Sequence, residues 1–270
     1  STIITTASMP SPGTTPRAAS PAATPINIRS FSTMLNDKKN NGFSLAPDNT
    51  KPSGSLIYRI IKRGFDVLFS AVLMIPVGIL IGIFSFAIKL DDGGSVFYMA
   101  ERTGRFGKTF KMFKLRSMKE NAPDIRLADG STYNGDDDPR VTRFGKFARK
   151  TSVDELPQII NILKGDMSFI GPRPDTPIGS AAYTDEEKII LTVRPGITGY
   201  NQAINRNSVL TKEKLANDIY YVRHLSLWFD IKIIFMTLMT VLKRKNVNRD
   251  GANLDDTFVL ENEKETTEIK

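Results

Sequence analysis

The sequence predicts an α+β protein, in which a small mixed α/β domain follows a membrane helix near the N-terminus. Three observations support this fold class: an apolar run without charges at 67–88, a strand–turn–strand pattern at 95–116, and helical apolar spacing further along. The chain has 270 residues, which allows one domain of ordinary size with appendages.

The composition describes a basic protein without cysteine. The formal net charge is +8; the first 55 residues contribute +3 and the last 24 contribute −4, so the middle carries +9. A basic body attracts anions such as nucleic acid, anionic lipid or phosphorylated small molecules. The absence of cysteine excludes disulfides and thiol nucleophiles. We expect the single histidine, His224, to be structural, so either a carboxylate acts as the general base or none is needed.

The two ends of the chain are predicted to be disordered. Residues 1–55 are rich in Ser, Thr, Pro, Ala and Asn and lack hydrophobic periodicity, which is typical of a low-complexity tail. No basic segment precedes a compact apolar core there, so a signal peptide is not expected. Residues 249–270 are polar and acidic and form the second predicted tail.

Residues 56–92 are predicted to form a membrane helix. Its apolar run, Val67–Ile88, would measure about 33 Å as a straight helix, enough for a bilayer core of about 30 Å. Pro76 lies near its middle, and an interior proline kinks or breaks a helix. Basic residues flank the run on both sides, which favours placing both flanks in the cytoplasm. The residues alone leave a re-entrant helix and a single span equally open, with a buried core helix as a third alternative.

The remaining segments, 93–248, are predicted to form the mixed α/β domain. Ser95–Glu101 and Thr109–Arg116 are rich in β-formers, and two glycines mark a hairpin connection between them. Asn121–Pro139 is predicted to be a loop. Its acidic cluster Asp136–Asp138 could bind a metal, but a solvated loop is favoured.

Two helices are expected after this loop. Apolar residues at helical spacing predict a helix over Asp154–Lys164, with Ser152 and Glu155 at capping-box spacing. The second is predicted over Ala216–Lys245, where a tryptophan and a basic end suit a helix lying on a membrane surface. An ordinary packed helix is the alternative for this segment.

Adjacent carboxylates within a basic segment suggest phosphate chemistry. Asp154 at a helix start should be ionised, because the helix dipole favours negative charge there. An ionised carboxylate can attack phosphorus, and Mg²⁺ held by Glu155 would offset the repulsion between the anions. Arg149 and Arg173 could bind phosphate oxygens. The structural alternative is that Glu155 only caps the helix and Asp154 only interacts with its dipole.

The chain resembles the monotopic phosphoglycosyl transferases, bacterial sugar transferases that start glycoconjugate assembly on a polyprenol carrier. The resemblance runs from about residue 58 to residue 248. It is carried by five blocks in order: KRGFD (62–66), GSVFYMAERTGRFGKTFKMFKLRSM (94–118), DPRVTRFGKFARKTSVDELPQIINILKGDMSFIGPRP (138–174), VRPGITGY (193–200) and DIYYVRHLSLWFDIKIIFMT (218–237).

The resemblance implies an enzyme that transfers a phosphosugar from a UDP-sugar to polyprenyl (undecaprenyl) phosphate and releases UMP. It implies that Asp154 is the nucleophile of a covalent phosphosugar–aspartyl intermediate and that Glu155 helps to hold Mg²⁺. Arg149 and Arg173 are then expected to bind phosphate or align the dyad. Lys114 and Arg116 belong to another basic motif near the site.

The resemblance also implies a location and partners. The membrane helix would be re-entrant and broken at Pro76, with the catalytic domain and its surface helices on the cytoplasmic face of the bacterial inner membrane. The phospholipid bilayer is then a partner, downstream glycosyltransferases are candidates, and a homodimer is compatible with this arrangement.

Three departures from the family pattern concern the membrane helix and the substrate region. Ile75 stands where small relatives often have serine, Tyr200 stands where tryptophan is common, and Ile204–Arg206 replaces an Asn-Gly-Arg pattern. The last region, including Arg206, is expected to touch nucleotide or sugar, so the donor sugar is left open. The alternative functions are a non-catalytic membrane scaffold of polysaccharide machinery and, more weakly, a nucleic-acid binder; no nucleic-acid motif is recognised.

Overall fold

The structure, a computed structural model, describes residues 50–127, 133, 135, 137–205, 209, 211–242 and 257–260. Most of the two predicted tails and Arg206 lie outside the described residues. Residues 50–55, which the sequence assigned to the first tail, lie against the body, where the hydroxyls of Ser53 and Thr192 are 2.7 Å apart.

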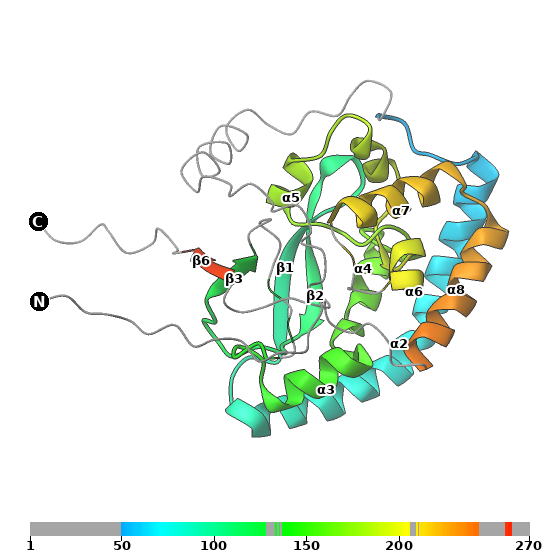
Figure 1. The fold of residues 1–270 in the computed structure, drawn as a ribbon. Coiled ribbons are helices and arrows are strands. Elements are labelled where there is room, and N and C mark those ends of the chain that lie inside the picture. The colour runs from blue at the N-terminus through cyan, green and yellow to red at the C-terminus, as the bar shows by residue number, and fades with distance from the viewer. Residues whose placement is uncertain are drawn as a thin grey trace, which may run out of the picture.

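Helix α2 (Leu56–Asp92) is the longest element of the described chain, with 37 residues. The hydroxyl of Ser55 caps its first turn by accepting a hydrogen bond from the Tyr58 amide, and Gly93 ends it in the left-handed conformation. The interruption predicted at Pro76 is not found, because the helix is continuous through this residue. Figure 1 shows that α2 is instead bent, running first beside α8 and then beside α3.

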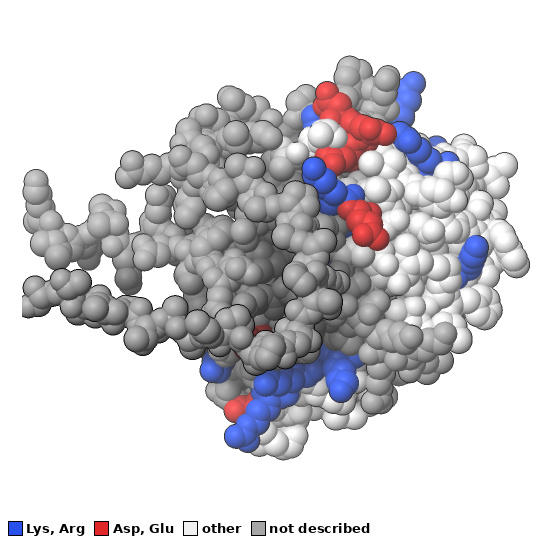
Figure 2. Space-filling view, in the orientation of Figure 1, with Lys and Arg blue, Asp and Glu red and all other residues white. Residues whose placement is uncertain are grey.

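The apolar residues of α2 are mostly on the surface. Within the described residues, α2 is the one helix long and apolar enough to cross a membrane, and only 11% of its apolar window is buried inside the protein. Figure 2 shows a broad area along the edge formed by α2 and α8 in which charged side chains are sparse. A core helix of a soluble domain would be mostly buried, so that alternative is disfavoured.

The predicted β-hairpin is confirmed. Strands β1 (Phe97–Thr103) and β2 (Thr109–Leu115) pair antiparallel, with Ala100 opposite Met112. A short 3-10 turn, η2 (Arg105–Gly107), connects them. The buried side chains of the hairpin pack against Ile162 and Met167 from the segment behind it, which forms one of the hydrophobic clusters of the core.

The other elements surround this hairpin (Figure 1). In chain order they are β3 (Asp124–Leu127), α3 (Arg143–Thr151), η3 (Val153–Glu155), α4 (Gln158–Lys164), β4 (Ser168–Ile170), α5 (Pro177–Ala181), η4 (Glu187–Thr192), β5 (Gly196–Thr198), α6 (Tyr200–Asn205), α7 (Thr211–Arg223), α8 (Leu227–Leu242) and β6 (Thr257–Leu260). Strands β4 and β5 are parallel, and β3 pairs antiparallel with β6. Strand β6 falls within the segment predicted as an acidic disordered tail.

The long helix predicted over Ala216–Lys245 is two helices, α7 and α8. The chain leaves the helical path at His224, and Ser226 starts α8 by accepting a hydrogen bond from the Phe229 amide at 3.1 Å. The periodicity of apolar residues continued across this junction, so it concealed the serine cap.

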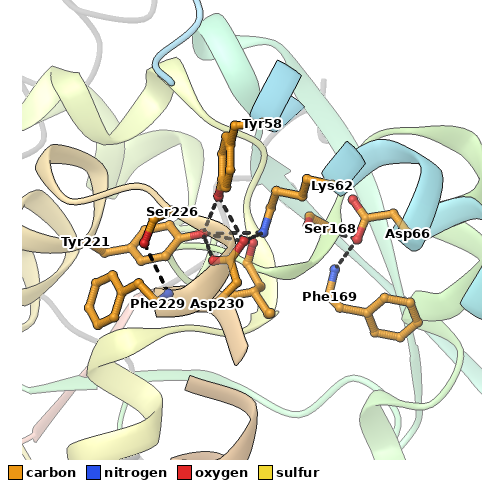
Figure 3. A network of polar contacts seen from close by, with 10 residues as sticks. Tyr58, Lys62, Asp66, Ser168, Phe169, Tyr221, Ser226, Phe229 and Asp230 are labelled. Atoms are coloured by element: carbon orange, nitrogen blue, oxygen red, sulfur yellow. Dashed lines mark hydrogen bonds and ion pairs between the residues drawn. The ribbon is translucent and has the colours of Figure 1, made fainter. Parts of the chain in front are cut away.

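A buried polar network holds α2 against α7 and α8 (Figure 3). Asp230 accepts hydrogen bonds from the Tyr221 hydroxyl at 2.8 Å and the Tyr58 hydroxyl at 2.9 Å, and forms an ion pair of 2.7 Å with Lys62. Because buried carboxylates are stable only when their charge is satisfied, this network fixes the start of α2 on the domain.

Candidate active site

The adjacent carboxylates predicted by the sequence lie in the short turn η3, between α3 and α4. Ser152 ends α3 with a φ of 61°, and the chain then turns through Val153–Glu155 before α4 begins at Gln158. The predicted capping box is wrong, because the Ser152 side chain makes no capping hydrogen bond to this turn. Asp154 and Glu155 are therefore positioned by a turn ahead of α4, and the helix-start argument for Asp154 does not apply.

Glu155 is held by two cations from different parts of the chain. Its Oε1 accepts a hydrogen bond of 3.0 Å from Lys114 Nζ and one of 2.6 Å from Arg173 Nη2. Burial alone would raise the pKa of Glu155, but the charges of Arg173 and Lys114 outweigh burial and lower it well below its ordinary value. Glu155 is therefore a fixed carboxylate at neutral pH.

Asp154 differs from its neighbour. Only 7% of its surface is exposed, and this burial raises its pKa. The charge of Glu155 raises it further, whereas Lys114, whose Nζ lies 3.9 Å from Asp154 Oδ2, opposes the shift. Glu155 is thus firmly ionised, whereas the raised pKa of Asp154 would fall if further positive charge were bound beside it.

Backbone contacts on both sides set the position of Arg173. The Pro172 carbonyl accepts a hydrogen bond of 2.9 Å from the Gly196 amide of β5. The Asp175 carbonyl accepts one of 2.9 Å from the Thr103 amide at the end of β1. With prolines on either side restricting φ, Arg173 has a fixed approach to the dyad.

A second layer of charge lies behind the dyad. Arg140 binds Asp138 through two contacts of 2.8 Å, from Nε and from Nη2, and Arg149 Nη1 lies 3.6 Å from the same carboxylate. Burial raises the pKa of Asp138, but its hydrogen bonds from Arg140 lower it overall. Asp138 is almost fully buried, so the predicted solvated loop is wrong at this residue.

Helix α3 packs against Ser117, just beyond the end of strand β2, which carries Lys114. The Arg149 Nε donates to the Ser117 hydroxyl at 3.2 Å. Gly145 in α3 lies so close to the Ser117 carbonyl that an added Cβ would come within 1.9 Å of that oxygen. Glycine is thus required where α3 packs on this backbone, and the packing aims Arg149 toward the dyad.

The structure brings together five of the seven site residues predicted from the sequence: Lys114, Arg149, Asp154, Glu155 and Arg173. Arg116 is buried and donates hydrogen bonds to the carbonyls of Ser95 and Met118, so it supports the backbone beside the site. The seventh residue, Arg206, lies outside the described residues.

Asp138 and Arg140 were missed as site residues by the sequence analysis. The signal for them was their close spacing on either side of Pro139, which lets one guanidinium reach back to the carboxylate.

The dyad could take part in binding a magnesium ion. Mg²⁺ commonly uses one or two carboxylates together with waters and substrate phosphates. Asp154 and Glu155 supply such hard oxygen ligands, although the described residues contain no cluster of three acidic, histidine or cysteine side chains that could bind a metal alone. The residues therefore fit an ion that is shared with a phosphorylated substrate.

A turn with two carboxylates, clamped by cations and accompanied by a long apolar surface helix, is suited to phosphate chemistry near a lipid surface. The sequence profile of the family described as "Bacterial sugar transferase" matches residues 57–244, and the chain belongs to this family.

Several curated relatives support this membership. The chain is 40% identical over 195 residues to the UDP-N-acetylgalactosamine-undecaprenyl-phosphate N-acetylgalactosaminephosphotransferase of Aeromonas hydrophila, covering 70% of this chain and 45% of that protein. It is 39% identical over 191 residues to the galactosyl transferase CpsE of Streptococcus agalactiae serotype III (strain NEM316), covering 68% of this chain and 42% of that protein. It is also 39% identical over 193 residues to the exopolysaccharide production protein ExoY of Sinorhizobium fredii (strain NBRC 101917 / NGR234), covering 67% of this chain and 85% of that protein.

The relatives differ in length. The chain spans less than half the length of the Aeromonas and Streptococcus proteins but most of the Sinorhizobium protein. The family match, residues 57–244, covers the dyad, its cations and nearly all of α2.

Proposed function

We propose that this protein transfers a phosphosugar from a UDP-sugar to polyprenyl phosphate, with undecaprenyl phosphate as the acceptor, and releases UMP. The observation that carries the proposal is the dyad itself, in which Glu155 is clamped by Lys114 and Arg173 while Asp154 lies beside it. The names of relatives support the class of substrates, because the Aeromonas relative is named for UDP-N-acetylgalactosamine and undecaprenyl phosphate.

The first step forms a covalent intermediate on Asp154. A carboxylate oxygen of Asp154 attacks the sugar-bearing phosphorus of the donor, and the bond from that phosphorus to the bridging oxygen breaks. The electron pair leaves with UMP, so one phosphosugar is esterified to Asp154. Positive charge from Lys114 and Arg173 counters the repulsion between the attacking carboxylate and the donor phosphates.

The second step returns Asp154 to its free form. A phosphate oxygen of the polyprenyl carrier attacks the phosphorus of the intermediate, and the acyl-phosphate bond breaks. The products are the polyprenyl diphosphate sugar and the Asp154 carboxylate. Neither step needs a general base when Asp154 reacts as its carboxylate and the carrier as its phosphate anion.

Magnesium is the proposed cofactor, held by Glu155 with a contribution from Asp154. When bound, a divalent cation supplies charge neutralisation for the donor diphosphate and the leaving UMP. Glu155→Gln should raise the Mg²⁺ concentration needed for half-maximal activity, because one ligand loses its charge. An unchanged magnesium titration would contradict this role.

The apolar surface of α2 supports membrane association, and we propose the cytoplasmic side of the inner membrane as the location of the catalytic domain. Large exposed side chains such as Ile57, Ile75 and Phe86 cover α2, and α8 adds Trp228 and Phe235. We propose that α2 enters and leaves the bilayer on one side, because basic residues flank both ends of its apolar run. Reagents that label cysteines introduced at Lys62 and Arg102 from the same side would support this topology, and labelling from opposite sides would contradict it.

A non-catalytic scaffold is the competing function. It would not need a buried Asp154 beside a clamped Glu155, because burying carboxylates is costly unless a specific arrangement compensates for it. The sugar is not assigned, since one relative is named for galactose transfer and another for N-acetylgalactosamine phosphate transfer.

The test is a panel of UDP-sugars assayed for UMP release with undecaprenyl phosphate, using the full chain in detergent or nanodiscs. We expect Asp154→Asn to abolish release with the accepted donor, because the amide is a far poorer nucleophile. The matched control is Asp185→Asn, whose carboxylate side chain is 80% exposed and pairs with Lys188. Near-parental turnover by Asp154→Asn would overturn the mechanism, and no release with any donor would overturn the function.

A further inference from the structure

A second basic site lies at the far end of α4 from the dyad. Its pocket opens between the start of α2, the η2 turn and the segment before β5. The charged residues that line it are Arg59, Lys62, Arg63, Asp66, Arg105 and Arg194. Helix α4 has seven residues, so about 10 Å of helix separates this pocket from the turn that carries Asp154.

The two carboxylates at or beside the pocket, Asp66 and Asp230, already have partners within the protein. Asp66 accepts hydrogen bonds from the Ser168 hydroxyl at 3.0 Å and the Phe169 amide at 3.1 Å, and Lys62 is paired with Asp230 at 2.7 Å. Five cationic side chains line the pocket, and two carboxylates, Asp66 in its lining and Asp230 paired with Lys62, offset part of their charge. The pocket therefore has a surplus of about three positive charges.

Two of the arginines also have a structural role. Arg63 donates hydrogen bonds to the carbonyls of Ile162 and Leu163, at 2.6 and 3.0 Å, and Arg194 donates to the Gly165 carbonyl at 2.9 Å. These contacts satisfy the carbonyls at the C-terminal end of α4. Arg63 and Arg194 are thus fixed in place, and they present fixed charge to the pocket.

The other two arginines lack such partners in the described part of the chain. The Arg59 Nε is buried there without a hydrogen-bond partner, and no described carboxylate lies within ion-pair distance of Arg59 or Arg105. Burial lowers the pKa of Arg105, and the charge of Arg59 lowers it further. Burial also lowers the pKa of Arg194, and the charges of Arg105 and Arg63 lower it further. Like charges held together in this way are stabilised by an anion between them.

The surroundings of the pocket indicate where the anion comes from. Leu225 lines the pocket, and the exposed apolar side chains of Leu56, Ile57 and Ile60 lie on the adjoining turns of α2. Trp228, which is 76% exposed, lies at the start of α8, and the Tyr58–Asp230 hydrogen bond joins these two helix starts. A basic pocket beside exposed apolar side chains matches a lipid whose headgroup is anionic and whose tails are apolar.

We propose that this pocket binds the phosphate-bearing headgroup of an anionic phospholipid, at a site separate from the dyad. The proposal rests on the membrane association proposed above but not on the transferase chemistry. A bound headgroup would neutralise the arginines and hold the start of α2 at the depth of the membrane surface.

The test compares lipid binding by the parent chain and two charge-matched double variants. Arg59→Gln/Arg105→Gln removes the two arginines without structural hydrogen bonds, and Lys146→Gln/Lys150→Gln removes two exposed charges from α3. Native mass spectrometry in neutral detergent would count retained phosphatidylglycerol against phosphatidylcholine. We expect one retained phosphatidylglycerol for the parent and the α3 variant, and at least tenfold weaker retention for the pocket variant.

Thermal unfolding distinguishes a missing site from a missing fold and a lipid from free phosphate. In neutral detergent the pocket variant should melt at or above the parental temperature, because repulsion is relieved. Phosphatidylglycerol should raise the melting temperature of the parent but not of the pocket variant. Equal retention by all three proteins would overturn the proposal, and so would equal protection of the parent by millimolar inorganic phosphate alone. Transferase activity is not part of this test, so its failure leaves the proposed reaction unaffected.

Discussion

Replacing Arg173 with alanine removes one of the two cations that hold Glu155. The substitution breaks the hydrogen bond of 2.6 Å from Arg173 Nη2 to Glu155 Oε1, while Lys114 keeps its hydrogen bond of 3.0 Å to the same oxygen. A hydrogen bond to a charged group contributes about 1.5–3 kcal/mol. The lower part of that range applies, about 1.5–2 kcal/mol, because the Arg173 side chain is 32% exposed and water screens the pair.

This energy converts into two measurable quantities. The melting temperature in detergent should fall by about 3–8 °C, at about 2–4 °C for each kcal/mol in a domain of this size. If the same hydrogen bond aligns Glu155 in the transition state, kcat/KM for UMP release should fall at least about 10- to 30-fold. Arg173→Lys should give intermediate values, because it keeps the charge but loses the planar donor geometry.

The matched control is Arg223→Ala, which breaks the Arg223–Glu186 pair of 2.7 Å. Both side chains are more than half exposed, at 54% and 67%, so the expected effect on stability is small. The reasoning is refuted if Arg173→Ala and Arg223→Ala give the same melting temperature and both keep kcat/KM within twofold of the parent.

Three further substitutions test the structure around the site. Asp218 is fully buried, its carboxylate oxygens have no hydrogen-bond partner in the described part of the chain, and burial raises its pKa to about 7. Asp218→Asn should therefore be the more stable protein above pH 7, with an advantage that grows by about 2.5 kcal/mol between pH 5 and pH 7.5 in thermal or urea unfolding. Asp230→Asn should cost about 3 kcal/mol in the same assay, because it leaves the partly buried Lys62 without its ion-pair partner. Ile162→Ala should cost about 2–5 kcal/mol, because Ile162 is fully buried in the cluster beneath the hairpin.

The sign of the Asp218 prediction follows from its two protonation states. In the unfolded chain an aspartate ionises near pH 4, whereas in the folded protein it keeps its proton up to about pH 7. The folded state therefore binds more protons in this interval, and stability falls as the pH rises through it. Lys214, which opposes the shift, and Asp175, which adds to it, are the nearby charges. A stability difference between Asp218→Asn and the parent that does not change with pH would contradict the assignment.

The other two substitutions also have outcomes that contradict the account. Unchanged stability of Asp230→Asn would show that the network in Figure 3 does not hold α2 to the domain. Ile162→Ala should leave the magnesium requirement unaltered, since Ile162 faces the hydrophobic cluster and not the dyad. A large change in that requirement would show that the packing and the site are coupled.

The sequence predicted the elements whose signals are local. The hairpin followed from β-forming residues on either side of glycines, and β1 and β2 lie where it placed them. The long apolar helix followed from composition, and α2 includes the predicted run. Asp154, Glu155, Arg149 and Arg173 followed from adjacent carboxylates within a basic segment. Lys114 followed from the family blocks, because spacing alone could not bring a residue so far away in the chain to the dyad.

The errors arose where tertiary contacts decide the outcome. Glu155 has capping-box spacing from Ser152, but two cations bind its carboxylate more strongly than a backbone amide would. Asp138 stands in a polar acidic segment that is typical of a solvated loop, yet Arg140 makes its burial possible. The break between α7 and α8 depends on a single serine cap, which apolar periodicity does not reveal.

The central claim is that a carboxylate oxygen of Asp154 becomes bonded to phosphorus during turnover. The most direct measurement is peptide mass spectrometry of the full chain incubated with its accepted UDP-sugar and Mg²⁺ in the absence of polyprenyl phosphate. We predict one added phosphosugar mass on the peptide that contains Asp154, which disappears when the acceptor is supplied and is absent from Asp154→Asn. Product formation without any such added mass, or an adduct on a different residue, would contradict the account.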